Sequence, residues 1–326
     1  MPFATISVVI PVHGVEDYLD RCLDSILGQE GPVLEVIAVN DASPDRCAGI
    51  LAARQDPRLR VIRTESAVGP GGARELGAKE ATGEYIWFID GDDELADGAL
   101  AAVAAQLDQL QPDVLIVDYE NLYPDGSTSP SGGQLSGPSP TTLAQSPGLI
   151  HLTMTVWSKV FRREFLAGLG VSFGPSIHED VPVSSLALLT AKRIGVLDQV
   201  CYRYRRARRG SFLAAVSDKN FAIFASYLLV VPHAVPPVRA AVFERAMWHY
   251  TTVLPLVPRA RRHEFFRLMT SDFRRWRPDE FRFPPGPRGM KLRLVARGAY
   301  WTYTAVEPLN RLRVMLRSVV RSPARP

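Results

Sequence analysis

Three aspartates stand within four positions after an apolar segment, because YIWFIDGDD places Asp90, Asp92 and Asp93 directly behind Ile89. Carboxylates this close repel one another, and a bound cation offsets that repulsion. Oxygen ligands of this kind are those that Mg²⁺ and Mn²⁺ favour. The cluster therefore predicts a site for a divalent metal ion together with an anionic ligand. The alternative is an ordinary acidic turn at the protein surface, since a short DxD sequence also occurs by chance.

The acidic cluster ends one of several short apolar segments that alternate with helical patterns. Runs of apolar and β-branched residues predict strands over residues 5–11, 34–40, 59–64, 83–90 and 113–120. Apolar residues at helical spacing predict helices between them, over residues 16–27, 43–55, 71–81 and 98–110. Strands separated by helices imply an α/β fold with a mostly parallel sheet that is covered on both faces.

Ligands of such sheets bind beyond the carboxyl ends of the strands. Three predicted strands reach polar or turn residues at that end: the first at residues 11–14, the second at 40–41 and the fourth at 90–92. We therefore expect these three strand ends to meet in one crevice that holds a ligand.

The remainder of the chain changes in character. Residues 121–150 are rich in Pro, Ser and Gly, which predicts a long loop. A helix is predicted over 178–191, and a strand from residue 194 runs into the basic sequence YRYRRARRGS. From about Lys219 the pattern is helical, with breaks at prolines. These patterns predict an α/β domain over residues 1–215 and a helical C-terminal region over residues 216–326.

The bulk composition places limits on the class of protein. The chain has 326 residues, 46% of them hydrophobic, which is enough for one or two packed cores. The first residues are interpreted as a strand rather than a signal peptide. The sequence contains no stretch of about 18 uncharged apolar residues, the length needed to span a bilayer. The three cysteines are far apart and form no zinc or disulfide pattern, which is typical of a reducing cytoplasm. We therefore expect a cytoplasmic protein.

Charge is unevenly distributed along the chain. From Arg259 onward there are 17 Lys and Arg against 5 Asp and Glu, a balance of +12, whereas the preceding residues carry 21 against 29, a balance of −8. In the tail, leucines and valines share one side of a predicted helix over 309–321, and arginines lie on another. Either this helix packs on the body or on a second subunit, giving a homo-oligomer, or it lies on the anionic inner face of the plasma membrane.

Four segments resemble, in order and spacing, the signature sequences of family 2 glycosyltransferases: VVIPVHGVEDYLDRCLDSI, VNDASPD, GPGGARELGAKEATGEYIWFIDGDDEL and HEDVPVS. The resemblance covers roughly residues 5–212. It implies the GT-A fold and an inverting sugar transfer from a nucleotide-diphosphate sugar, expected to be UDP-linked, with Mn²⁺ or Mg²⁺ as cofactor. Within that family the sequence is similar to bacterial enzymes of cell-wall and capsule polymers. The acceptor implied is a hydroxyl of a cell-envelope glycan, a polyol-phosphate (teichoic-acid-like) polymer or a lipid-linked molecule, and no nucleic acid is expected as a partner.

The same resemblance implies a nucleoside pocket at the first two strand ends. Pro11, Val12 and Glu16 would line this pocket, and Asp41 would hydrogen-bond the uracil or the ribose. The alternative for Asp41 is a helix cap, a common place for aspartate.

The diphosphate and the metal are expected beside the acidic cluster. Arg74 would face the diphosphate, because its planar guanidinium meets phosphate oxygens in pairs. Asp90 would touch the ribose or groups behind the metal ligands, and Asp92 would ligate the metal ion that bridges the diphosphate. Arg206 and Arg209, in the basic segment, could close over the diphosphate. The alternative for each arginine is an ordinary solvated surface position.

By resemblance, Asp180 in the sequence HED would be the general base that takes the proton of the acceptor hydroxyl, with Glu179 as its rival. The alternative for Asp180 is a charge that merely favours the start of a helix. Trp157 is interpreted either as a platform for the acceptor sugar or as a core residue. Residues 13–14 and Glu75 depart from the usual family pattern, and these departures leave the donor sugar open.

Two other functions compete with sugar transfer. A nucleotidyltransferase would need a Gly-rich loop with a Lys or Arg after the first strand, and PVHGVEDYL lacks the basic residue. A NAD-dependent dehydrogenase would need GxGxxG there, which is absent. A non-catalytic scaffold could bind a polymer or a membrane through the arginine-rich tail, but the complete set of carboxylates argues against it.

Overall fold

The computed structural model describes residues 4–31, 33–131, 138–152, 154–174, 177–207 and 216–306. Contacts divide the chain into two compact units. The first comprises Met1–Leu213 with Ser226–Val238, and the second comprises Ala214–Ala225 with Arg239–Pro326. Arg209 and the predicted amphipathic tail over 309–321 lie outside the described residues.

The first unit is built on one nine-stranded sheet, counted over the described residues. The strands follow the order β3-β2-β1-β4-β8-β6-β9-β5, and β7 pairs with β6. The strands are β1 Ile6–Val12, β2 Val33–Asn40, β3 Leu59–Arg63, β4 Tyr85–Phe88, β5 Glu94–Leu95, β6 Val114–Leu122, β7 Thr128–Pro130, β8 Lys159–Arg162 and β9 Ile194–Arg205. The helices are α1 Leu19–Leu27, α2 Cys47–Ala53, α3 Gly69–Glu80, α4 Ala99–Leu110, η1 Pro147–His151, α5 Arg163–Ala167 and α6 Asp180–Thr190.

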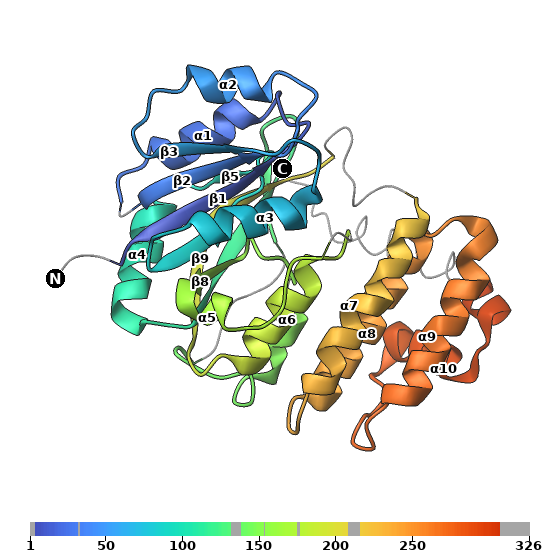
Figure 1. The fold of residues 1–326 in the computed structure, drawn as a ribbon. Coiled ribbons are helices and arrows are strands. Elements are labelled where there is room, and N and C mark those ends of the chain that lie inside the picture. Colours follow the sequence, from blue (N-terminus) through green and yellow to red (C-terminus); the bar gives the residue numbers. More distant parts are fainter. Residues whose placement is uncertain are drawn as a thin grey trace, which may run out of the picture. The chain divides into compact units, whose positions relative to one another are not determined.

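The first four strands of the sheet order, β3, β2, β1 and β4, all run parallel, so their carboxyl ends share one edge. Figure 1 shows α1 and α3 on opposite sides of these strands. Alternating residues of β1 explain this arrangement: Val8 and Ile10 belong to the core that includes α1 and α4, whereas Val9 faces α3. Helix α3 approaches so closely that a Cβ at Gly77 would lie 2.3 Å from Val9 Cγ1.

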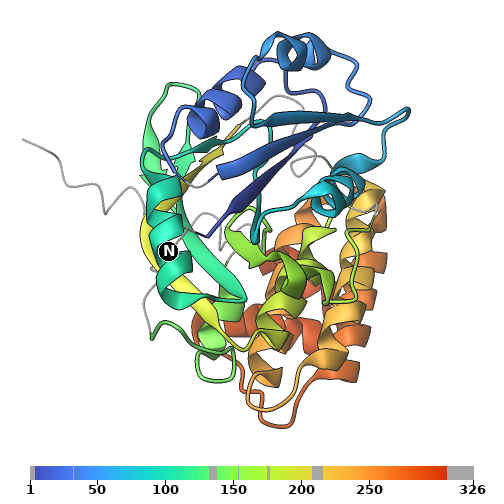
Figure 2. The same cartoon turned by 60° about the vertical axis from the view of Figure 1, so that its left-hand side comes forward.

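The other half of the sheet mixes strand directions. Strand β8 runs antiparallel to both β4 and β6, and β9 runs parallel to β6, beside which it is seen in Figure 2. The far end of β9 also pairs antiparallel with β5, which opposes Arg203 to Glu94 and Tyr202 to Leu95. Because β5 immediately follows the acidic cluster, this pairing brings the end of β9 beside it.

The predicted alternation of strands and helices is confirmed, with local differences. Helix α2 begins at Cys47 rather than near residue 43, because the Asp45 carboxylate accepts a hydrogen bond from the Cys47 amide at 3.1 Å and so precedes the first turn. The predicted loop over 121–150 contains β7 and η1, since β6 extends to Leu122 and pairs back with β7. The short strand β5 was not predicted.

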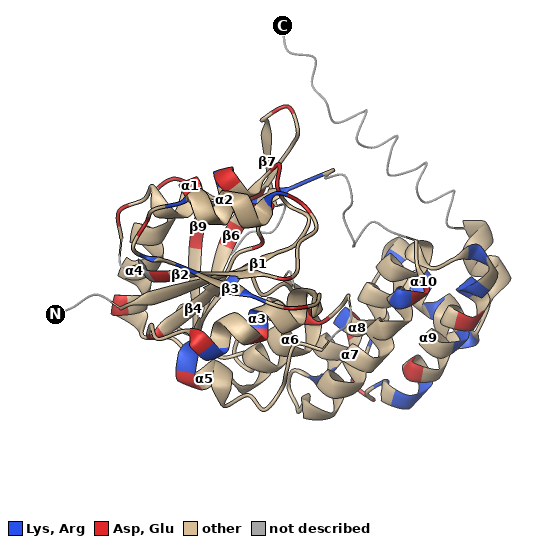
Figure 3. Cartoon of the chain, turned by 45° about the horizontal axis from the view of Figure 1, so that its top comes forward, with Lys and Arg blue, Asp and Glu red and all other residues tan. Residues whose placement is uncertain are grey.

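The second unit is helical, as the sequence predicted. It contains η3 Asp218–Phe221, α8 Arg239–Val253, η5 Leu254–Leu256, η6 Arg259–Arg261, α9 Arg262–Trp276 and α10 Gly286–Arg297, while α7 Ala222–Val230 contributes to both units and η4 Val231–His233 follows it in the first. The rings of Phe243, Phe273 and Phe281 pack together with centroids 4.8–6.1 Å apart. Lysines and arginines recur along α9 and α10 (Figure 3). Among the described residues, we find no helix with the length and apolar character needed to cross a bilayer.

Candidate functional site

The acidic cluster lies directly beyond β4, at the shared edge of the parallel strands. One carboxylate oxygen from each of Asp90, Asp92 and Asp93 falls within 4.8 Å of the others. Asp90 and Asp92 are partly exposed, whereas Asp93 is only 1% exposed. Burial, together with the nearby charges of Asp92 and Asp90, raises the pKa of Asp93 well above its ordinary value. The three aspartates are therefore not equivalent, and only two of them present side chains to solvent.

Strand β9 holds Asp93 from the protein side. The Tyr202 hydroxyl donates to Asp93 Oδ2 at 2.6 Å, and the Arg205 amide donates to Asp93 Oδ1 at 2.7 Å. The same Tyr202 oxygen accepts a hydrogen bond from the Asp90 amide at 3.2 Å. Both Asp93 oxygens are thus engaged by β9, and the backbone of the cluster is fixed through Tyr202.

The side chain of Arg205 also closes on the cluster. Its Nε donates to the Asp92 carbonyl oxygen at 2.7 Å, its guanidinium forms an ion pair with Glu94, and it lies over the Tyr18 ring at 4.9 Å. The sequence analysis did not identify Arg205 as a residue of the site. Nothing local in YRYRR shows which arginine turns inward, because only the pairing of β9 with β5 decides it.

Arg74 connects two parts of the site from α3. Its Nη2 donates to Asp90 Oδ1 at 2.7 Å, and its Nη1 donates to Glu179 Oε1 at 2.6 Å. The residue is only 5% exposed, and its Nε has no hydrogen-bond partner among the described residues. The structure thus brings the acidic cluster and the HED segment together through one buried guanidinium.

Asp180 begins α6, one residue after the ion-paired Glu179. Burial and the neighbouring Glu179 charge raise the pKa of Asp180 from 3.8 to about 7, although Arg74 acts in the opposite direction. Asp90 lies near enough to contribute to this increase. The fully buried Lys159 of β8, which sequence reasoning also missed, acts on Asp180 in the same direction as Arg74. Because Glu179 is held in an ion pair with Arg74, Asp180 is the better candidate of the two carboxylates to accept a proton.

The predicted nucleoside residues lie at the ends of β1 and β2. Asp41 is buried, and its carboxylate accepts hydrogen bonds from Thr64 Oγ1 at 2.9 Å and from the Val68 and Gly69 amides at 2.7 and 2.8 Å. It therefore joins the end of β2 to the start of α3. The Asp41 carbonyl oxygen lies 2.7 Å from His13 Nδ1, which ties it to the end of β1.

The other predicted residues are more dispersed. Pro11 is partly exposed and Val12 is buried at the end of β1, and Glu16 accepts hydrogen bonds from the backbone and side chain of Arg46. Arg206 is exposed, with its guanidinium 5.4 Å from the centroid of the Tyr204 ring. Arg209 lies outside the described residues. Trp157, for which two roles were open, is a core residue at 5% exposure, stacked on Tyr202 with centroids 4.4 Å apart.

Comparison with known proteins identifies the family. The family described as Glycosyl transferase family 2 matches residues 7–170, about half of the chain. The chain belongs to this family. It is 31% identical over 209 residues to the uncharacterized glycosyltransferase EpsJ of Bacillus subtilis, covering 61% of this chain and 60% of EpsJ. It is 30% identical over 223 residues to the poly(ribitol-phosphate) beta-N-acetylglucosaminyltransferase TarS of Staphylococcus aureus, covering 66% of this chain and 38% of TarS.

The fold agrees with the family. A crystal structure of S. aureus TarS residues 1–349 in complex with UDP superposes with a TM-score of 0.73 at 22% identity, covering 94% of this chain and 91% of that one. The predicted GT-A fold with a helical C-terminal region is therefore confirmed. The relatives, which also include the minor teichoic acid biosynthesis protein GgaB of B. subtilis at 27% identity over 221 residues, bear out the resemblance to bacterial wall-polymer enzymes.

Proposed function

We propose that this protein transfers a sugar from a UDP-linked donor to an acceptor hydroxyl, with inversion at the anomeric carbon. One observation carries the proposal: Arg74 joins Asp90 of the acidic cluster to Glu179, beside a carboxylate at Asp180 whose pKa is raised. A site for an anionic leaving group and a candidate base thus adjoin one another at the ligand-binding edge of the sheet. The UDP complex of TarS supports a uridine diphosphate as the nucleotide part of the sugar donor.

The acidic cluster has the donor chemistry for a divalent cation. We propose that Asp92 ligates Mn²⁺ or Mg²⁺, with Asp90 beside it, because these two carboxylates are partly exposed while Asp93 is occupied by β9. When bound, such a cation neutralises charge on the departing diphosphate. Arg74 holds Asp90 in place through its hydrogen bond to Asp90 Oδ1.

Asp180 is the proposed general base. A carboxylate with a pKa of about 7 is ionised in an appreciable fraction at neutral pH, yet basic enough to accept a proton from a hydroxyl as that oxygen attacks. In a single displacement the new C–O bond forms as the bond to the diphosphate breaks, the bonding electrons leave with the diphosphate, and the proton goes to Asp180. Glu179 accepts the hydrogen bond of Arg74 and precedes the first turn of α6.

The residues near the carboxyl ends of the strands are proposed to bind the rest of the nucleotide. Pro11, Val12 and Glu16 are proposed to line the nucleoside pocket, with Asp41 shaping its floor through the start of α3. Arg206 and Arg209 are proposed to contact the diphosphate. The exposed position of Arg206 leaves its guanidinium accessible to a ligand.

The division of labour along the chain is also a proposal. We assign donor binding and catalysis to residues 1–215, and contacts with acceptor, a second subunit or the inner membrane surface to residues 216–326. The proposed acceptor is a polyol-phosphate polymer or another cell-envelope glycan on the cytoplasmic side, supported by the relatives TarS and GgaB. Membrane contact through the basic tail predicts salt-sensitive binding to anionic vesicles that disappears when residues beyond 288 are removed, and binding indifferent to both would contradict it.

A screen of nucleotide sugars tests the proposed activity. The purified chain is incubated with Mn²⁺ and each donor, with and without a ribitol-phosphate acceptor, and released nucleotide is measured. We expect release from a UDP-sugar and none from the Asp180→Asn variant in the transfer reaction. Calorimetry with UDP, with and without Mn²⁺, separates an enzyme from a scaffold, since a scaffold would show no metal-dependent nucleotide binding.

A further inference from the structure

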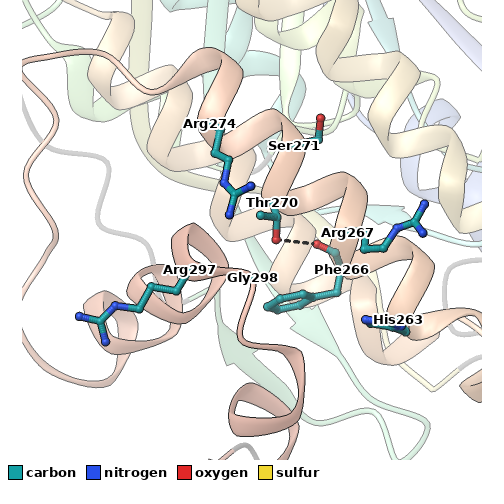
Figure 4. Close-up of a pocket in the computed structure, with 8 residues that line it drawn as sticks. All are labelled: His263, Phe266, Arg267, Thr270, Ser271, Arg274, Arg297 and Gly298. Atoms are coloured by element: carbon teal, nitrogen blue, oxygen red, sulfur yellow. Dashed lines mark hydrogen bonds between the residues drawn. The ribbon is translucent and has the colours of Figure 1, made fainter.

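A cavity lies within the helical unit, between α9 and the end of α10. Its volume is about 510 Å³, which is within the range of small-ligand sites. Arginines stand on both of its walls: Arg267 and Arg274 from α9, and Arg297 from the end of α10. Figure 4 shows these side chains, with the Phe266 ring pointing from α9 toward the chain at Gly298. No Asp or Glu is among the residues that line it.

The spacing along α9 explains how one helix supplies this wall. His263, Arg267, Thr270 and Arg274 follow one another at intervals of four, three and four residues, so they lie along one face of the helix. The Thr270 hydroxyl donates to the carbonyl oxygens of Phe266, at 3.0 Å, and Val295, at 3.1 Å. The second bond ties α9 to α10, so the two walls of the cavity are fixed to one another.

Several other arginines of this unit have partners, although Arg259 and Arg275, which do not line the cavity, have no hydrogen-bond, ion-pair or ring partner among the described residues. Arg261 pairs with Glu264, Arg288 pairs with Glu244, and Arg277 and Arg293 lie over the Phe283 ring. By contrast, within the described part of the chain, the three cavity arginines have no hydrogen bond, no carboxylate within 4.0 Å and no ring partner; these are Arg267, Arg274 and Arg297. Their charge is therefore available to a ligand.

The C-terminus of α10 could instead account for the cluster of arginines, because it attracts positive charge. A helix C-terminus carries about half a negative charge, and Arg274 Nη2 lies 3.8 Å from where a Cβ on Gly298, the C-cap of α10, would be. Three full positive charges exceed that partial charge severalfold. Glu264, one turn from Arg267 on α9, already accepts hydrogen bonds from Nε and Nη2 of Arg261. A positive excess therefore remains at the cavity.

We propose that this cavity binds a phosphodiester group of the polyol-phosphate acceptor. Guanidinium forks match phosphate oxygens in pairs. This assignment rests on the proposed function, because it names the part of the acceptor that the helical unit recognises. It identifies the helical unit as a specificity element for phosphate-bearing polymers.

The test measures binding of a synthetic ribitol-phosphate oligomer of defined length to the full chain by calorimetry at low ionic strength. We compare the wild type with Arg274→Gln, Arg297→Gln and the double variant. The matched control is Arg259→Gln, which removes the same charge at an exposed position of the same unit that does not line the cavity. We expect each cavity variant to weaken binding about tenfold, the double variant to weaken it further, and the control to change it less than about twofold.

Several outcomes would overturn the assignment. An equal loss in Arg259→Gln would show that only overall charge matters, and unchanged binding in the double variant would exclude the cavity. Inorganic phosphate that binds as tightly as the oligomer would remove the polymer from the proposal. The last experiment uses anionic phosphatidylglycerol vesicles. If the vesicles displace the oligomer from the wild type and do not bind the double variant, the cavity binds a lipid headgroup instead.

Failure of this inference is distinguishable from failure of the proposed function. UDP binding with Mn²⁺, and slow release of nucleotide from the donor alone, depend on the first unit and should be unchanged in the double variant. If the wild type lacks both, the proposed activity is wrong whatever the oligomer does. Because Arg274 and Arg297 are exposed, both variants should keep the wild-type thermal midpoint, which checks that they fold.

Discussion

The Tyr202 hydroxyl donates to Asp93 Oδ2 at 2.6 Å and accepts from the Asp90 amide at 3.2 Å, so one buried phenol joins both ends of the acidic cluster. Tyr202 is itself fixed by stacking on Trp157, with ring planes 13° apart. The rigidity of the proposed metal site therefore originates in the core of the first unit rather than in the turn itself. Residues that orient ligands in this way are commonly as important as the ligands.

Removing the phenol hydroxyl should loosen the metal site. We expect Tyr202→Phe to weaken Mn²⁺-dependent UDP binding by about tenfold or more, because Asp90 and Asp92 lose their fixed placement. The buried Asp93 carboxylate and Asp90 amide also lose a partner, which should lower the free energy of unfolding by about 2 kcal/mol. Calorimetric titration of Mn²⁺ at fixed UDP measures the first effect. Tyr204→Phe is the control, and an unchanged Mn²⁺ affinity in Tyr202→Phe would show that the Tyr202 hydroxyl does not fix the metal ligands.

The aspartates of the cluster should separate into two classes. Asp92→Ala is expected to abolish metal-dependent nucleotide binding, with a smaller loss of stability than Asp93→Ala because Asp92 is partly exposed. Asp93→Ala should instead lower the free energy of unfolding by about 2 kcal/mol or more, since the Tyr202 hydroxyl and the Arg205 amide would be left buried without their acceptor. Urea unfolding and UDP calorimetry on both variants give the comparison. Equal stability losses at the two positions would contradict the distinction.

Asp180 should govern the pH dependence of transfer. As a general base it must be ionised, so turnover should fall below its pKa of about 7, by about tenfold per pH unit, and reach a plateau above it. Asp180→Asn should remove transfer while UDP binding stays close to that of the wild type. Glu179→Gln is the neighbouring comparison and should reduce turnover less. Near-normal turnover in Asp180→Asn would overturn the assignment of the base.

The same pKa shift makes a prediction about stability. The folded state holds the Asp180 proton more tightly than the unfolded chain, so the stabilisation is complete below pH 3.8 and is lost as pH rises through about 7. An amide does not ionise, so Asp180→Asn should lose less stability than the wild type between pH 5 and pH 8. Thermal midpoints measured across that range test this. Parallel curves for the two proteins would mean that the carboxylate is not disfavoured by burial.

The extent to which the sequence predicted this site depends on the range of the contacts. Asp90 and Asp92 stand next to a strand end, and their short spacing was sufficient to expect a cation there. The partners of the cluster were not predictable in this way, because Tyr202 lies 109 residues from Asp93 and Glu179 lies 105 residues from Arg74. Arg74 was expected to face a diphosphate, and the structure adds two carboxylates that fix it. Long-range contacts such as the pairing of β9 with β5 bring these residues together, and they have no local sequence signal.

The fold itself depends on one close approach that can be tested directly. Helix α3 carries Arg74 to the site and crosses β1 at Gly77, where an added Cβ would lie 2.3 Å from Val9 Cγ1 and 3.3 Å from Val39 Cγ2. We expect Gly77→Ala to lower the free energy of unfolding by about 1–3 kcal/mol, because the helix must move away from the sheet. Since that shift also moves Arg74, UDP binding should weaken in the same variant. Gly49→Ala, where a Cβ would meet no atom within 4 Å, is the control in helix α2. A Gly77→Ala protein as stable as the Gly49→Ala protein would show that the helix–sheet contact tolerates the extra methyl group.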